Sequence, residues 1–99
     1  MMDKNLKEKW VKALRDGAYR QTTGALRDEN GYCCIGVLCD LIDSTKWTKE
    51  GWDNVGMTIL PSYKLGMPTD GFMRELVALN DDRGSSFAEI ADVIEGTNI

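Results

Sequence analysis

Three cysteines lie close together in the chain, and their chemistry has to be weighed first. Cys33, Cys34 and Cys39 could supply a thiolate, which is both a nucleophile and a metal ligand. A cysteine nucleophile normally takes its base from histidine, and this chain of 99 residues contains no histidine. A zinc site normally presents two paired cysteine arms, whereas one arm is present here. We therefore expect buried structural cysteines, and we predict no catalytic residue, no metal site and no cofactor.

Adjacent carboxylates offer a second kind of chemistry, general acid–base catalysis. Pairs occur at residues 28–29, at Asp40 and Asp43, and at residues 81–82. A glycosidase needs two carboxylates that face each other across a cleft, but a chain with 16 acidic residues offers such pairs by chance. The sequence has no glycine-rich phosphate loop. The residues therefore favour a protein that is not an enzyme, with a small hydrolase as the alternative.

Basic and aromatic side chains in the first third of the chain form the best candidate binding surface. Residues 1–27 carry seven basic and three acidic side chains, whereas residues 28–99 carry five and thirteen. Guanidinium groups beside an aromatic ring suit a nucleotide or another small anionic ligand. Two alternatives stay open: the opposite charges pair within the fold, or the acidic C-terminal half binds a partner protein. The predicted ligand-binding residues are Arg15, Tyr19, Arg20 and Arg27.

The last predicted helix invites comparison with DNA-binding proteins. Residues 87–96 resemble the first helix and turn of a helix-turn-helix motif. A protein of that kind needs a recognition helix after the turn, and only three residues follow. The surrounding half of the chain is acidic, which would repel phosphates. We therefore do not expect sequence-specific DNA binding.

The elements that must position these residues can be placed from periodicity and turn chemistry. A helix is predicted over residues 5–16, with Asn5 and Glu8 as a capping pair. An Asn-Gly pair then indicates a tight hairpin, because both residues accept the backbone angles of such a turn. The hairpin is predicted as a strand over residues 25–27, a turn over 28–31 and a short strand over 32–33.

The helix predicted over residues 34–43 is apolar on most of its sides, which places it at the centre of a small domain. Gly36 lies inside this helix, where glycine costs about 1 kcal/mol relative to alanine. Its presence therefore indicates a close neighbour on that face of the helix.

The second half of the chain is less regular. Residues 44–56 fit either a loose hairpin with Trp47 and Trp52 at its sides or an irregular loop, and the sequence does not decide whether these tryptophans are core or binding surface. Ser86 and Glu89 form a capping box that starts the last helix. The remaining predictions are a strand over residues 57–60, a short helix from Pro61 to Leu65, and helices over residues 72–79 and 87–95.

The sequence thus predicts a helix-rich α+β fold, with about four to five helices around the central helix over residues 34–43 and a short antiparallel hairpin or small sheet. A length of 99 residues indicates a single compact domain over residues 1–99. No apolar stretch approaches the about 20 residues that cross a bilayer, and no signal sequence is evident, so we expect a cytoplasmic protein without a membrane partner. The predicted core consists of Trp10, Leu14, Cys34, Ile35, Leu38, Cys39, Ile42, Leu76, Leu79, Phe87, Ile90 and Ile94.

Several blocks of the chain resemble a family of small phage and prophage proteins whose function is uncharacterised. The most specific block is Gly-Tyr-Cys-Cys-Ile-Gly-Val-Leu-Cys-Asp-Leu at residues 31–41. The resemblance extends over most of the chain and is weakest over residues 44–57. The other blocks are residues 10–15, Leu26-Arg27, Leu60-Pro61, residues 79–81 and residues 86–95.

This resemblance implies an origin and a class of function but assigns no catalytic residue. It implies a small accessory protein of a bacterial host's cytoplasm that acts by binding or sequestration, in an anti-defence or host-modulating role. The expected partner is a small anionic ligand, such as a nucleotide, or a host protein. A protein-binding inhibitor of a host enzyme, acting through the acidic C-terminal half, is the alternative, and a homo-oligomer is compatible with either.

Overall fold

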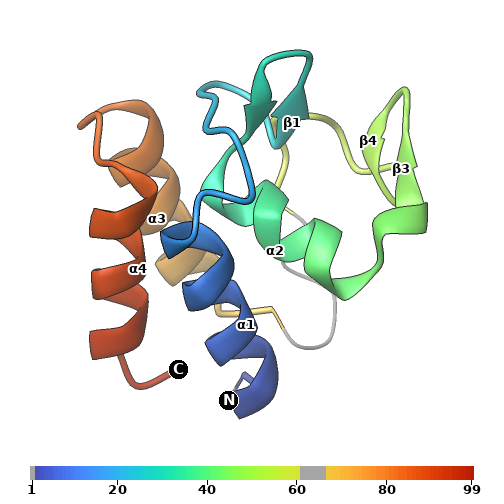
Figure 1. Cartoon of the computed structure of the whole chain (residues 1–99). Helices are drawn as coiled ribbons and strands as arrows, with labels where there is room; N and C mark the ends of the chain where they lie inside the picture. The colour runs from blue at the N-terminus through green and yellow to red at the C-terminus, as the bar shows by residue number, and fades with distance from the viewer. Residues whose placement is uncertain (1, 61–66) are drawn as a thin grey trace.

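The computed structural model of the chain describes residues 2–60 and 67–99. Within these residues it contains four α-helices, one short 3₁₀ helix and two separate antiparallel hairpins of two strands each (Figure 1). The predicted helix-rich α+β class is therefore confirmed. The elements are α1 (Lys4–Arg15), β1 (Arg27–Asp28), β2 (Gly31–Tyr32), α2 (Cys34–Ile42), η1 (Ser44–Lys46), β3 (Trp47–Thr48), β4 (Gly51–Trp52), α3 (Asp70–Asp81) and α4 (Phe87–Gly96).

The helix α2 occupies the middle of the molecule, as its apolar sequence predicts. It packs against α1 and α3, while α4 packs against α1 on the other side, and the two hairpins lie beyond α2 (Figure 1). Trp10 of α1 is fully buried, and its indole N–H donates to the carbonyl of Cys34 at 2.9 Å. This bond joins α1 to the first turn of α2. The helices thus form the core, and the two hairpins project from it.

The hydrophobic core agrees closely with the sequence prediction. Ten of the twelve predicted core residues are buried, including all those predicted in α1 and α4. Ile42 and Leu79 are only partly buried, so their prediction as core residues is corrected: both lie near the C-terminal ends of their helices, at the margin of the core.

The close neighbour predicted for Gly36 is the backbone of the segment that precedes β1. A Cβ atom on Gly36 would overlap the carbonyl group of Leu26. This carbonyl also accepts a hydrogen bond from the N–H of Cys33 at 3.0 Å, and the N–H of Leu26 donates to the carbonyl of Met57 at 2.6 Å. The glycine thus allows α2 to lie directly against a segment of backbone that is itself held by hydrogen bonds.

Two element boundaries differ from the prediction because side chains cap the backbone at other positions. The carboxylate of Asp3, not Asn5, accepts a hydrogen bond from the N–H of Leu6 at 2.9 Å, so α1 starts one residue earlier. The first hairpin has the register that the predicted turn over residues 28–31 implies, with Arg27 opposite Tyr32, but each strand reaches one residue further into the turn than predicted. The carboxylate of Asp28 accepts from the N–H groups of the turn that follows it, which fixes this register.

The connection between the second hairpin and α3 was only partly predicted. Residues 57–60 form turns and bends, so the predicted strand there is wrong: the carbonyl of Met57 bonds to Leu26 rather than to a strand in register. The helix predicted from Pro61 to Leu65 lies outside the described residues. Thr69 caps α3, which extends two residues further at each end than predicted, and the Ser86–Glu89 capping box of α4 is present. Among the residues described, no helix is long and apolar enough to cross a membrane.

Candidate ligand-binding site between the two hairpins

Arg15, the first predicted ligand-binding residue, is engaged with α4. Its guanidinium donates to Asp92 at 2.6 Å and to both carboxylate oxygens of Glu95 at 3.0 Å. These hydrogen bonds raise the pKa of Arg15 and lower the pKa of Glu95 below its ordinary value. At this position the basic N-terminal part of the chain pairs with the acidic C-terminal part, as one of the alternatives predicted. Arg15 therefore links α1 to α4, and its N–H donors are already used.

Of the other three predicted residues, Tyr19 and Arg27 meet Tyr32 through their side chains and Arg20 through its backbone alone, and only Arg27 lines the hollow described below. The rings of Tyr19 and Tyr32 meet edge to face with their centroids 4.9 Å apart. The carbonyl of Arg20 accepts a hydrogen bond from the N–H of Tyr32 at 2.8 Å, while the guanidinium carbon of Arg27 lies 5.7 Å from the centre of the Tyr32 ring. Tyr32 was not predicted as a site residue, although a two-residue turn places it directly opposite Arg27.

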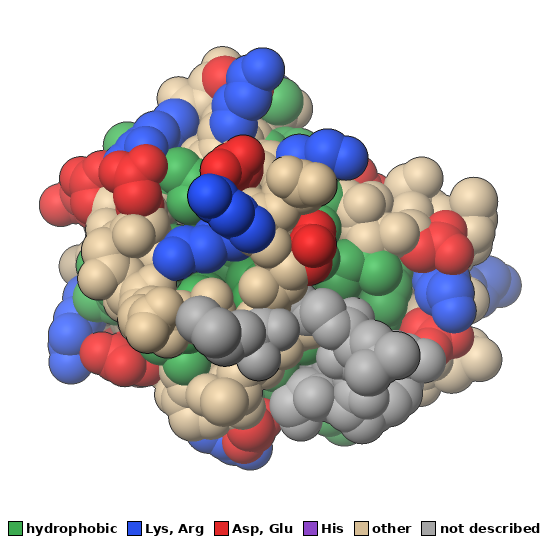
Figure 2. All heavy atoms as spheres, turned by 90° about the horizontal axis from the view of Figure 1, so that it is seen from below, with side chains coloured by type: hydrophobic (Ala, Val, Ile, Leu, Met, Phe, Trp, Pro, Cys, Tyr) green, Lys and Arg blue, Asp and Glu red, His purple; other side chains and the backbone are tan. Residues whose placement is uncertain are grey.

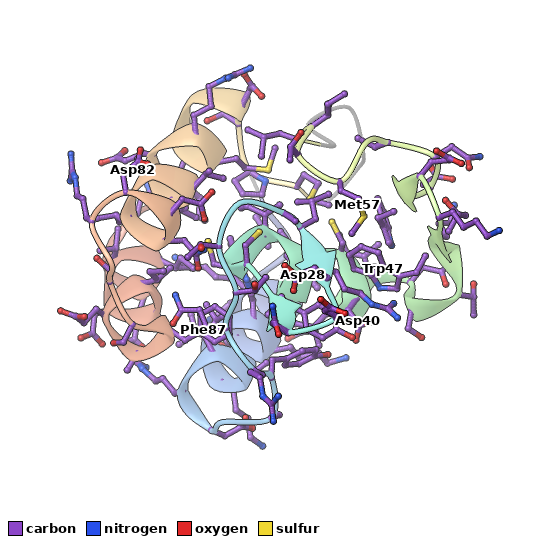
Figure 3. The ribbon with its side chains drawn as sticks, turned by 90° about the horizontal axis from the view of Figure 1, so that it is seen from above. Asp28, Asp40, Trp47, Met57, Asp82 and Phe87 are labelled. Carbon is purple, nitrogen blue, oxygen red and sulfur yellow. The ribbon has the colours of Figure 1, made fainter. Side chains whose placement is uncertain are left out.

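Trp47 completes an aromatic cluster with Tyr19 and Tyr32, and Asp40 of α2 fixes two of its members. One carboxylate oxygen of Asp40 accepts from the hydroxyl of Tyr19 at 2.7 Å, and the other accepts from the indole N–H of Trp47 at 3.0 Å. Figure 3 shows Asp40 and Trp47 beside the first hairpin. Burial and then the bond to Asp40 raise the pKa of Tyr19 above its ordinary value of 10.0. The carboxylate therefore anchors the cluster to the core helix.

The sequence does not decide whether Trp47 and Trp52 belong to the core or to a binding surface, and the structure places them differently. Trp52 is fully buried, and its indole N–H donates to the carbonyl of Asp43 at 2.9 Å. Trp47 is half-buried, and its ring also lies 5.9 Å from that of Tyr32. Trp52 thus holds the second hairpin to the core, whereas Trp47 reaches the surface.

A surface hollow of about 470 Å³ lies between the two hairpins, with Trp47 on its wall. Asp28, Trp47 and Met57 lie close to one another in the view from above (Figure 3). The guanidinium carbon of Arg27 is 5.0 Å from the centre of the Trp47 ring, so the cation is stacked on two aromatic rings at once. The lining consists of Arg27, Asp28, Glu29, Trp47, Thr48, Lys49 and Met57.

Arg27 differs from Arg15 in that its charge is not paired with a carboxylate. No ion pair joins Arg27 to an acidic side chain in the part of the chain that the structure describes. Its neighbour Asp28 is already engaged, because its carboxylate accepts from the N–H groups of Asn30 and Gly31 and from the hydroxyl of Thr22. Within the described residues, the N–H donors of Arg27 are therefore bound by no acidic side chain.

A larger groove of about 720 Å³ runs along α1, but it is less suited to an anion. Its guanidinium is that of Arg15, which is occupied by α4, and its lysines alternate with Glu8, Asp16 and Glu95. Figure 2, which views the end of the molecule that carries both termini, shows basic and acidic side chains interspersed. Acidic side chains line both sites, so the distinction lies in the guanidinium: that of Arg27 is in no ion pair within the described residues, which makes the hollow between the hairpins the better candidate site.

The three cysteines are buried, as predicted, and their environment raises the pKa of each thiol. Burial raises the pKa of Cys33 from 9.0 to about 11, and it raises the pKa values of Cys34 and Cys39 as well. The sulfur of Cys33 accepts a hydrogen bond from the N–H of Gly36 and caps α2, and the thiol of Cys34 donates to the carbonyl of Leu76. Among the described residues, no three cysteine, aspartate or glutamate side chains form a group that could hold a metal ion.

These raised thiol pKa values predict that the protein loses stability in alkali. Below about pH 9 the thiols are neutral in both the folded and the unfolded chain, whereas at higher pH the unfolded chain alone releases their protons. The free energy of unfolding should then fall by about 1.4 kcal/mol per pH unit for each thiol concerned, up to its folded-state pKa. Urea denaturation from pH 7 to 10.5 under reducing conditions measures this fall.

Cys33→Ser is the matched control for this prediction, because serine keeps an acceptor that can cap α2 but does not titrate in this range. Its stability should fall less steeply than that of the unmodified protein between pH 9 and 10.5. The same slope in both proteins would contradict the buried, neutral state of Cys33.

Comparison with known proteins gives one match. A family model described as a domain of unknown function (DUF8296) matches residues 2–70. The matched range runs from α1 to the first residue of α3 and includes the aromatic cluster and the whole hollow. No curated protein and no solved structure matches the sequence.

Proposed function

This chain belongs to the DUF8296 family, and we propose that it is a binding protein that captures a small anionic ligand in the hollow between its hairpins. One observation carries the proposal: the guanidinium of Arg27 is stacked on Tyr32 and Trp47 but has no carboxylate partner among the residues described. A guanidinium held in this way is oriented before the ligand arrives, so little side-chain entropy is lost on binding.

The surroundings of Arg27 favour an anion that also has an apolar or aromatic part. Trp47 and Met57 line the hollow and supply apolar contact area. The planar guanidinium can form two parallel hydrogen bonds with a phosphate or carboxylate group. Asp40 holds Trp47 in place through the indole N–H, so this wall of the site is fixed by α2. A nucleotide has both of the required parts.

Binding without turnover agrees with the state of the reactive side chains. The three thiols are buried with raised pKa values, which keeps them protonated at neutral pH. The carboxylates nearest to the aromatic cluster, Asp28 and Asp40, each accept hydrogen bonds from at least two protein groups. The alternative through the acidic half receives less support, because Asp92 and Glu95 are already paired with Arg15.

The biological setting of the proposal comes from the resemblance to small phage and prophage proteins. A compact protein that binds a ligand without changing it can act by lowering the free concentration of that ligand. We therefore place the protein in the cytoplasm of a bacterial host, as an accessory protein that modulates the host by sequestration.

Titration with inorganic phosphate at constant ionic strength tests the proposed site. The nuclear magnetic resonance signals of the Trp47 indole N–H and the Arg27 side-chain N–H should shift and saturate. Arg27→Gln should weaken phosphate binding at least about ten-fold, because charge-assisted hydrogen bonds contribute about 1.5–3 kcal/mol.

Lys12→Gln is the control, since it removes the same charge from an exposed position on α1. Its phosphate affinity should equal that of the unmodified protein. Shifts confined to α1, or equal affinities for Arg27→Gln and Lys12→Gln, would show that the hollow is not the site.

A further inference from the structure

The hollow receives a second cation, from the second hairpin. Lys49 lies in the turn of the second hairpin, directly after β3, and follows Trp47 by two positions. Both residues line the hollow, as do Arg27 and Glu29, which have the same spacing in the first hairpin. Each hairpin thus contributes one cation to the same space.

Lys49 is also without a carboxylate partner among residues 2–60 and 67–99. The other lysine of this segment, Lys46, pairs instead with Asp53, at 3.9 Å. Glu29 is the exposed acid on the wall of the hollow, and no hydrogen bond or ion pair of its side chain is present within the described residues. The lining therefore carries one cation from each hairpin and two carboxylates, of which Asp28 accepts hydrogen bonds from neutral groups while Glu29 accepts none from the described residues.

We propose that the ligand carries two anionic groups, one bound by Arg27 and the other by Lys49, and so bridges the two hairpins. This inference rests on the proposed function and narrows the ligand to diphosphates and other molecules with two separate anionic groups. The two cations suit different tasks: the fixed guanidinium of Arg27 orients one group, and the flexible ammonium of Lys49 follows the position of the other. A ligand with a single anionic group would leave Lys49 in solvent.

Glu29 places a negative charge on the wall of the hollow, opposite in sign to the charges of Arg27 and Lys49. Its carboxylate repels any anion that enters the hollow, and the repulsion increases with the charge of the ligand. Removal of this charge should therefore tighten binding, and more so for pyrophosphate, which carries the larger charge, than for a single phosphate.

Isothermal titration calorimetry with inorganic pyrophosphate and inorganic phosphate, at matched ionic strength, tests the two-point binding. Lys49→Gln should weaken pyrophosphate binding about five-fold, the upper range for an exposed ion pair, and should weaken phosphate binding by a clearly smaller factor. Glu29→Gln should tighten pyrophosphate binding, and Lys12→Gln should change neither affinity.

The outcomes separate this inference from the proposed function. If phosphate binds through Arg27 but Lys49→Gln affects pyrophosphate no more than Lys12→Gln does, the ligand with two anionic groups is contradicted and the anion site remains. If the unmodified protein binds neither anion, both the site and the inference are overturned.

Discussion

Gly36→Ala is expected to lower the free energy of unfolding by about 3 kcal/mol, at the upper end of the cost of overpacking. Helix propensity alone predicts the opposite, a gain of about 1 kcal/mol from replacing a glycine inside a helix. The sign reverses because the new methyl group would overlap the carbonyl of Leu26. That carbonyl cannot easily move away, since its residue is held at both ends by hydrogen bonds to Cys33 and Met57.

Gly71→Ala is the matched control, because this glycine is also helical but a Cβ there meets no atom within 4 Å. It should be neutral or stabilising by up to about 1 kcal/mol. Urea denaturation of the two variants measures the difference. A Gly36→Ala protein as stable as the Gly71→Ala protein would show that α2 does not lie against Leu26.

Leu38→Ala is expected to cost about 2–5 kcal/mol, because it empties volume in the core without allowing the surrounding helices to close. Leu38 is fully buried in α2, which packs against both α1 and α3. In a domain of this size each 1 kcal/mol corresponds to about 4–8 °C in Tm, so the variant should melt at a clearly lower temperature.

The comparison for Leu38 is Ile59→Ala, which shortens a side chain that is 61% exposed. Its effect should stay within about 0.5 kcal/mol. Thermal unfolding followed by circular dichroism distinguishes the two variants. An unchanged Tm for Leu38→Ala would mean that α2 is not the centre of the core.

The helices could be predicted because their signals are local. The capping box of Ser86 and Glu89 and the apolar repeat that follows specify α4 without any reference to the rest of the chain. Gly36 carried tertiary information as well, since a costly residue in an apolar helix implied a close neighbour. The identity of that neighbour, the Leu26 carbonyl, could not be read from the sequence.

The irregular elements could be predicted less well because their hydrogen bonds are not local. Residues 57–60 have the composition of a strand. The carbonyl of Met57, however, accepts a hydrogen bond from the N–H of Leu26, which lies 31 positions earlier. Asp28 likewise uses one carboxylate oxygen for the predicted turn and the other for the hydroxyl of Thr22. Neither choice leaves a periodic pattern in the sequence.

The candidate site also combines residues that the sequence predicts with contacts that it does not. The sequence singled out Arg15 and Arg27 equally, because both are arginines in a basic segment. Only the packing of α4 against α1 decides that Arg15 meets Asp92 and Glu95. Likewise, only the position of the second hairpin decides that Arg27 stacks on Trp47, which is 20 residues away.

Native mass spectrometry of the protein purified from a bacterial host tests the central claim most directly. The spectrum is compared with that of the denatured protein, for the unmodified chain and for Arg27→Gln and Lys12→Gln. We predict an anionic species bound to the unmodified protein and to Lys12→Gln, lost on denaturation and absent from Arg27→Gln. The mass of the free protein in all three samples, or a species that Arg27→Gln retains, would contradict ligand capture at Arg27.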